Sequence, residues 1–151
     1  MRILMVCLGN ICRSPMAEGI MRFRAEEAGI DLETDSAGTA NYHVGEEPDH
    51  RAVRYMKSRG IDISNLRGRQ FHRRDFEYFD RIYVMDASNF QNVMKLAESD
   101  EHRAKVKMIL DEVYPGEQRP VPDPWFGDMS DFEAVYDMLD EAARQITASL
   151  R

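Results

Sequence analysis

The stretch ILMVCLGNICRSP at residues 3–15 sets the strongest limits on how this chain can fold. Its first four residues are an unbroken apolar run, which is typical of a strand buried on both faces of a sheet. After a short loop, Ser14 suits a helix N-cap and Pro15 suits the first helical position. Apolar residues then recur at helical spacing, at Met16, Ile20 and Phe23. The sequence therefore predicts a strand, a tight loop and a helix in direct succession.

A loop of this kind is suited to hold an oxyanion. The backbone N–H groups of a curled loop and of a helix N-terminus converge on one point and carry partial positive charge. Gly9 allows a sharp turn, and the guanidinium of Arg13 matches two oxygens of a phosphate. The same field stabilises a thiolate at Cys7, and the Ser14 hydroxyl is placed to donate to that sulfur. A cysteine after a strand is often only a small buried residue, but Cys-x5-Arg-Ser in this setting favours a reactive thiol.

The residues from Val6 to Pro15 resemble the phosphate-binding loop of the low-molecular-weight protein tyrosine phosphatases. The length of the chain and the N-terminal position of the motif agree with this family, whereas the larger tyrosine phosphatases usually carry His in place of Val6. The resemblance implies that Cys7 attacks phosphorus and that Arg13 binds the phosphate. It also implies hydrolysis of phosphotyrosine and aryl phosphate monoesters through a phospho-cysteine.

The remaining pattern alternates strands with helices. Strands are expected at residues 30–36, 81–85 and 106–110, and helices after residue 45, from 86 to about 97 and from Ser130, with Ser130 and Glu133 as a capping box. A short helical turn is expected at 75–80. This alternation predicts a single α/β domain over residues 1–151, a three-layer sandwich of the flavodoxin-like or Rossmann-like kind with a four-stranded parallel sheet.

A second motif, VPDPWFG at residues 121–127, lies in a proline-rich loop before the last helix. Pro122 and Pro124 restrict the backbone on both sides of Asp123. The motif resembles the general-acid loop of the same family, so Asp123 is expected to protonate the leaving oxygen and then to activate water. Trp125 and Phe126 are then expected to line the substrate cleft. Taken alone, the motif would fit an ordinary turn with Trp125 as a core anchor.

The resemblance also assigns supporting roles. Asn10 and Ser36 are expected to hold the loop in its curled shape, together with the loop residues Leu8, Gly9, Ile11, Cys12 and Ser14, although Ser36 alone would fit a plain turn. His50 is expected at the rim of the cleft, or else on a solvated helix start. Cys12 is expected either to pack passively or to form a disulfide with Cys7 under peroxide, which would protect Cys7 from over-oxidation.

Composition narrows the remaining possibilities. The net charge of −7 and the pI near 5.1 give no indication of nucleic-acid binding. No apolar run is long enough for a membrane span, and no leader pattern is visible. Neither the four histidines nor the two cysteines have metal-ligand spacing, so no metal and no cofactor are expected. We expect a cytoplasmic enzyme, monomeric or a weak homodimer, that acts on tyrosine-phosphorylated proteins or peptides and releases inorganic phosphate.

Three alternatives stay open at this point. A thiol-linked arsenate reductase has a similar loop, but it passes electrons through later cysteines, and this chain has none after Cys12. A phosphate- or phosphopeptide-binding module would not need Cys7, Arg13 and Asp123 together. A phosphocarrier would pass its phosphoryl group from Cys7 to a partner rather than to water.

Overall fold

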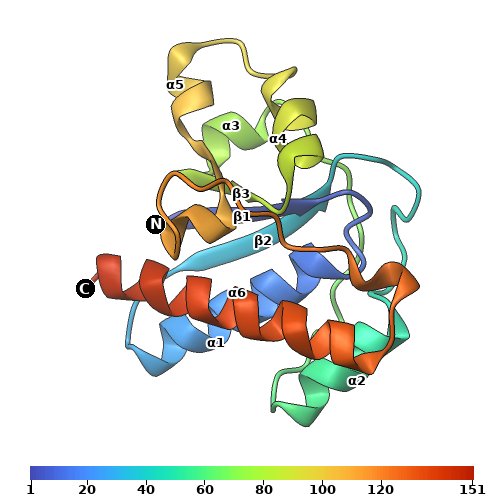
Figure 1. Ribbon diagram of the computed structural model, residues 1–151. Coiled ribbons are helices and arrows are strands. Elements are labelled where there is room, and N and C mark those ends of the chain that lie inside the picture. Colours follow the sequence, from blue (N-terminus) through green and yellow to red (C-terminus); the bar gives the residue numbers. More distant parts are fainter.

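The computed structural model describes residues 1–151 and has a parallel four-stranded sheet at its centre (Figure 1). The spatial order is β2-β1-β3-β4, and the strands are β1 (Arg2–Cys7), β2 (Glu33–Gly38), β3 (Arg81–Val84) and β4 (Val106–Met108). The predicted α/β class and parallel sheet are confirmed. The strand order reverses between β1 and β3, which is the position where ligands bind in open parallel sheets.

Helices cover both faces of the sheet and make the fold a three-layer sandwich (Figure 1). One layer consists of α1 (Arg13–Glu27), α2 (His50–Ser58) and α6 (Met129–Ser149). The other consists of α3 (Asp75–Tyr78), α4 (Ala87–Met94) and α5 (Asp100–Ala104). Two 3₁₀ turns, Ile109–Glu112 and Pro124–Phe126, complete the regular structure.

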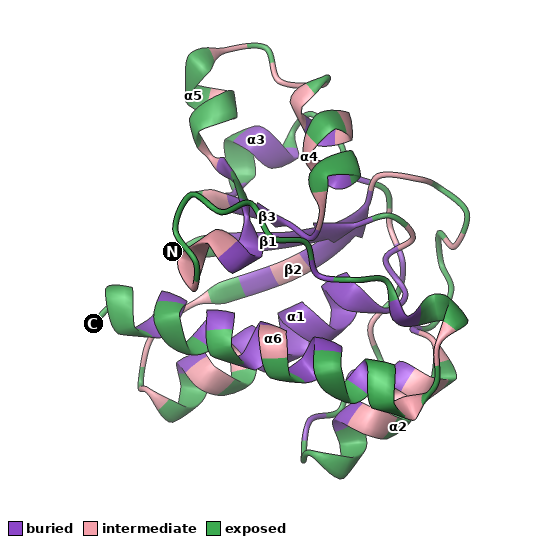
Figure 2. Ribbon diagram, in the orientation of Figure 1, coloured by how far each residue is buried: buried purple, intermediate pink, exposed green.

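Strand β1 is buried on both faces, as its apolar run predicts. Ile3 and Met5 belong to the core shared with α1, α2 and α6, whereas Leu4 and Val6 belong to the core beneath α3 and α4. Figure 2 shows the buried residues concentrated in the sheet and on the inward sides of the helices. This double packing fixes the end of β1, and therefore Cys7, within the rigid centre of the molecule.

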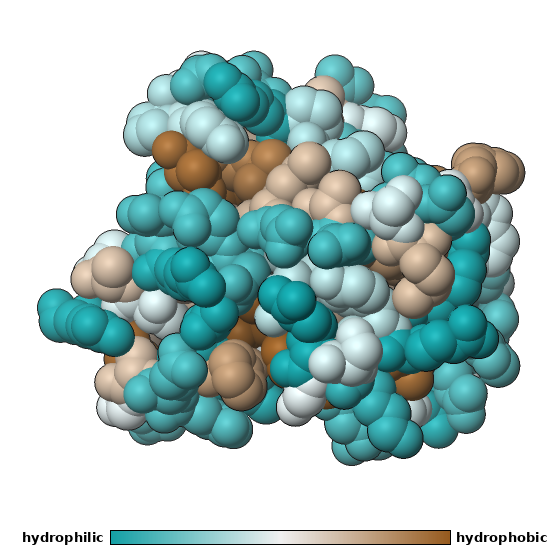
Figure 3. Space-filling model, turned by 60° about the horizontal axis from the view of Figure 1, so that its bottom comes forward, coloured by the Kyte–Doolittle hydropathy of each residue, from teal (hydrophilic) through white to brown (hydrophobic).

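The face of the molecule drawn in Figure 3 is mostly hydrophilic. In Figure 3 the side of the molecule that carries α1 and α6 presents polar and charged side chains, with hydrophobic residues in separate small areas. No helix combines the length and the apolar composition that crossing a membrane requires.

Several predicted boundaries were wrong, including the starts of two helices. Helix α1 begins at Arg13, and Ser14 does not cap it, because the Ser14 hydroxyl contacts Cys7 and Asn10 instead. Helix α6 begins after Asp128, which forms a capping box with Asp131 rather than Ser130 with Glu133. The second strand runs from residue 33 to 38, two residues beyond the prediction, and β4 ends before the 3₁₀ turn at 109–112. Helix α5 was not predicted.

Candidate active site

The loop between β1 and α1 curls around the sulfur of Cys7. The Ser14 hydroxyl lies 3.0 Å from Cys7 Sγ, and the backbone N–H of Asn10 donates to the same sulfur at 3.3 Å. Asn10 has a φ of 60°, a left-handed conformation that asparagine tolerates better than most residues. These contacts place hydrogen-bond donors on a thiolate at Cys7.

A buried hydrogen-bond chain supports the loop from behind. The side-chain amide of Asn10 donates to Ser14 Oγ at 2.8 Å and to Ser36 Oγ at 3.0 Å, and its oxygen accepts from the backbone N–H of Arg69. The Ser36 hydroxyl in turn donates to Glu18 Oε1 at 2.7 Å. The contact between Asn10 and Ser36 is the one that the resemblance implied, whereas no motif in the sequence pointed to Glu18.

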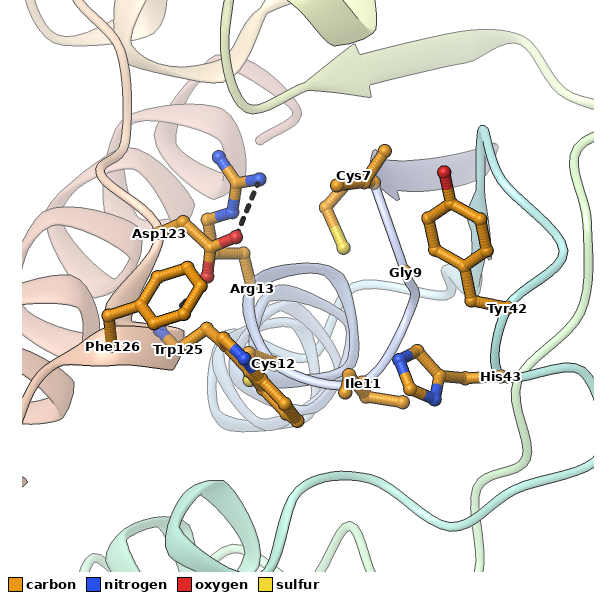
Figure 4. A pocket seen from close by; sticks show the side chains of 11 residues that line it. Cys7, Gly9, Ile11, Cys12, Arg13, Tyr42, His43, Asp123, Trp125 and Phe126 are labelled. Carbon is orange, nitrogen blue, oxygen red and sulfur yellow. Dashed lines mark hydrogen bonds and ion pairs between the residues drawn. The ribbon is translucent and has the colours of Figure 1, made fainter.

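Arg13 is nearly fully buried, and three oxygens surround its guanidinium. Nη1 donates to Asp86 Oδ2 at 2.8 Å and to the backbone oxygen of Val121 at 2.9 Å, and Nη2 lies 3.7 Å from Asp123 Oδ2. Asp86 is the N-cap of α4 and also accepts from the backbone N–H of Asn89. The carboxylate of Asp86 thus orients the guanidinium of Arg13. The remaining N–H groups of that guanidinium face the cavity (Figure 4).

Asp123 lies opposite Cys7 at the mouth of the same cavity (Figure 4). Its Oδ1 accepts from the backbone N–H of Trp125 at 3.0 Å, at the start of the Pro124–Phe126 turn. The Asp123 side chain is 43% exposed, so it can exchange a proton with water. Position and exposure both suit a general acid and base.

The cavity has a volume of about 260 Å³ and mostly apolar walls. Trp125 and Phe126 form one side, with Phe126 almost fully exposed, and Leu8, Ile11 and Cys12 belong to the lining as well. Tyr42 and His43 form the opposite side (Figure 4). Sequence reasoning missed these two residues, since they lie in an irregular loop after β2 without a recognisable motif.

The structure also places two other predicted site residues, His50 and Cys12. His50 does not line this cavity; it is the first residue of α2 and lines a neighbouring hollow that also touches His43 and Trp125. Cys12 lines the cavity, and both cysteines are free thiols. Burial, reinforced by the nearby carboxylate of Asp49, raises the pKa of the Cys12 thiol well above its ordinary value. Cys12 is therefore protonated at neutral pH.

No three His, Cys, Asp or Glu side chains are grouped so that they could hold a metal ion. The positive charge that faces a bound anion comes instead from Arg13 and from the backbone N–H groups of the loop. The arrangement combines a nucleophilic sulfur, a cradle for an oxyanion and a carboxyl group on the far side of the cavity. These are the parts that transfer of a phosphoryl group to a cysteine requires.

Comparison with known proteins agrees with this chemistry. The family model described as low molecular weight phosphotyrosine protein phosphatase matches residues 2–151. The low molecular weight phosphotyrosine protein phosphatase of Saccharomyces cerevisiae is 40% identical, over 95% of this chain and 91% of the yeast protein. A protein tyrosine phosphatase from Entamoeba histolytica is similar in structure, with a TM-score of 0.92, 34% identity and coverage of 99% and 96% of the two chains.

A Drosophila arginine phosphatase has the same fold, with a TM-score of 0.92, 31% identity and coverage of 100% and 98% of the two chains. The family match extends over nearly the whole sequence and includes both motifs. The chain belongs to the low molecular weight phosphotyrosine protein phosphatase family.

Proposed function

We propose that this enzyme hydrolyses phosphotyrosine through a phospho-cysteine intermediate on Cys7. The observation that carries the proposal is the convergence of Cys7, Arg13 and Asp123 on one cavity. Cys7 Sγ attacks phosphorus and forms the S–P bond while the P–O bond to the tyrosyl oxygen breaks. Asp123 gives its proton to that oxygen, so tyrosine leaves as a neutral phenol.

The second step returns the enzyme to its starting state. Asp123, now a carboxylate, removes a proton from a water molecule that attacks phosphorus, and the S–P bond breaks to release inorganic phosphate. In both steps Arg13 and the loop N–H groups stabilise the charge on the equatorial oxygens. Ser14, at 3.0 Å from the sulfur, stabilises the departing thiolate.

The walls of the cavity favour an aryl substrate. Tyr42, Trp125 and Phe126 offer aromatic surfaces to a phenyl ring. A phosphoarginine side chain would bring a guanidinium group, which requires an acidic partner. Asp123 is the only carboxylate among the lining residues, and it already faces Arg13. We therefore infer a preference for phosphotyrosine over phosphoarginine.

The first test measures hydrolysis of aryl phosphates by the wild type, Cys7→Ser and Asp123→Asn. Cys7→Ser should be inactive but still bind phosphate. The rate of hydrolysis by Asp123→Asn should be about 10²–10⁴-fold below that of wild type for a substrate with a poor leaving group. A wild type that binds phosphate without hydrolysis would instead support a binding module. A stable phosphoenzyme that water does not discharge would support a phosphocarrier.

A second test compares peptides that carry phosphotyrosine or phosphoarginine at the same position. Faster hydrolysis of the phosphotyrosine peptide is expected from the apolar walls. Equal or faster hydrolysis of the phosphoarginine peptide would contradict the inferred preference without affecting the roles of Cys7, Arg13 and Asp123.

A further inference from the structure

The guanidinium of Arg51, in the first turn of α2, reaches across to the loop that carries Asp123. Nη2 donates to the backbone oxygen of Trp125 at 2.8 Å, and Nη1 donates to that of Gly127 at 3.0 Å. The group also lies 4.9 Å from the ring centre of Phe132, at the start of α6. Two separate backbone positions of the loop are thus held by one side chain.

Arg51 is itself fixed by Asp49, the N-cap of α2. Nε of Arg51 donates to Asp49 Oδ1 at 3.1 Å and Nη2 donates to Oδ2 at 3.2 Å, so the planar fork is held on two edges. The backbone N–H of Asp49 donates to the oxygen of Ile11 at 2.8 Å. Through Asp49 and Arg51, the start of α2 therefore ties the phosphate loop to the loop that carries Asp123.

The position of Asp123 depends on both ends of its loop. Upstream, the backbone of Val121 is bound on both sides, by the oxygen of Met85 and by Arg13. Downstream, the backbone N–H of Trp125 holds the Asp123 carboxylate, so a shift of Trp125 moves the acid itself. Arg51 anchors this downstream end.

We propose that Arg51 is a positioning residue for the general acid. It sets the distance between Asp123 and the phosphate loop without touching the substrate. The inference rests on the role proposed above for Asp123. Its particular consequence is that loss of Arg51 impairs protonation of the leaving group and leaves phosphate binding and the nucleophile intact.

The experiment compares kcat/KM of wild type and Arg51→Ala for aryl phosphates whose leaving groups differ in basicity. This parameter reports cleavage of the P–O bond, which needs the acid only when the leaving group is poor. The kcat/KM of Arg51→Ala for phenyl phosphate should be about tenfold or more below that of wild type, since small misplacement of a catalytic group is costly. With a highly activated aryl phosphate, the kcat/KM of Arg51→Ala should fall by less than about twofold. The inhibition constant of inorganic phosphate should equal that of wild type.

Two further variants separate positioning from charge and from stability. Arg54→Ala is the matched control and should behave as wild type, because Arg54 lies on the same helix but is exposed and its side chain makes no hydrogen bond or ion pair. Arg51→Lys keeps the positive charge but not the planar fork, so it should show most of the loss seen in Arg51→Ala. Full activity of Arg51→Lys would overturn the proposal.

A double mutant gives the decisive comparison. If Arg51 acts through Asp123, adding Arg51→Ala to Asp123→Asn should cause no further loss with phenyl phosphate. A multiplicative further loss, or an equal loss with good and poor leaving groups, would overturn the proposal. If Asp123→Asn itself fails to discriminate between leaving groups, the acid role of Asp123 is wrong and the failure lies in the proposed function instead.

Discussion

The side-chain amide of Asn10 donates a 3.0 Å hydrogen bond to the hydroxyl of Ser36, which lies 26 positions further along the chain. The bond joins the phosphate loop to the neighbouring strand β2. Since Ser36 also donates to the buried Glu18, the left-handed turn at Asn10 is held by a chain that ends inside the core. The shape of the phosphate loop is therefore set largely by side chains that do not line the cavity.

Removal of the Ser36 hydroxyl should weaken both the fold and the loop. Ser36→Ala leaves one hydrogen of the Asn10 amide and one oxygen of Glu18 without a partner, which costs about 1–3 kcal/mol in the free energy of unfolding. Urea unfolding and the inhibition constant of inorganic phosphate measure the two effects. Ser58→Ala, whose exposed hydroxyl bonds only to the backbone of its own helix, is the control. A stability and phosphate affinity equal to those of Ser58→Ala would contradict this role.

A methyl group at Gly38 should distort the phosphate loop. Gly38 is paired with Cys7 across the sheet, and a Cβ there would lie 2.8 Å from the backbone oxygen of Leu8 and 3.1 Å from the backbone carbon of Gly9. Because backbone cannot give way as a flexible side chain can, Gly38→Ala should reduce kcat/KM by about 10²-fold.

Gly116→Ala is the matched control for this substitution. Gly116 has a φ of 76° and open space around it, so the change strains the fold without disturbing the site. It should lower the free energy of unfolding by about 1–2 kcal/mol and leave kcat/KM unchanged. Wild-type activity in Gly38→Ala would refute the predicted clash.

Glu18 should make a distinctive contribution to the pH dependence of stability. Burial raises the pKa of this carboxyl group above its ordinary value, although Ser36 and Arg22 bind it. In the unfolded chain its pKa is about 4.3. Glu18 therefore stays protonated to a higher pH in the folded protein than in the unfolded chain. Its contribution to the free energy of unfolding falls as pH rises from the unfolded-state pKa through the folded-state pKa.

Glu18→Gln removes that titration. The free energy of unfolding of Glu18→Gln, relative to wild type, should increase as the pH rises from about 4 towards neutrality. Urea unfolding of both proteins across this range measures the difference. Parallel curves for wild type and Glu18→Gln would exclude the effect.

Cys12 should protect Cys7 from irreversible oxidation. Because burial keeps Cys12 protonated, the sulfur of Cys7 should be the first to attack a peroxide oxygen; the O–O bond breaks, leaving a sulfenic acid on Cys7 and releasing water. The Cys12 thiol can then condense with it, lose a second water and form a disulfide that an added thiol reduces. After peroxide treatment, activity should recover with thiol in wild type but much less in Cys12→Ser. Equal recovery of the two proteins would show that Cys12 only packs.

The sequence alone specifies the central strand and the loop that follows it. The apolar run of residues 3–6 requires burial on both faces, and a phosphate-binding loop needs its cysteine and its arginine close together in sequence. Cys7, Arg13 and Asp123 can be proposed from the sequence because each lies in a compact motif, and the structure brings all three to one cavity. The α/β class followed from the alternation of strand and helix patterns.

The starts of the helices depended on competition between neighbouring polar side chains. Ser14 is a good capping residue by type, but its hydroxyl bonds to Cys7 and Asn10. Asp128 and Asp131 form the capping box that the pattern assigned to Ser130 and Glu133. Residue preferences for the N-cap position favour several residues within two or three positions of one another, and the folded geometry determines which of them caps the helix.

Which distant residues meet at the site depends on the packing of the folded chain. Asp86 and Arg13 are 73 positions apart, and Arg51 and Trp125 are 74 apart, yet both pairs are hydrogen-bonded. Tyr42 and His43 reach the cavity only because their loop leaves the same edge of the sheet as the phosphate loop. Such contacts depend on the order of strands and the packing of helices, because sequence periodicity fixes which face of an element is buried but not which element lies against it.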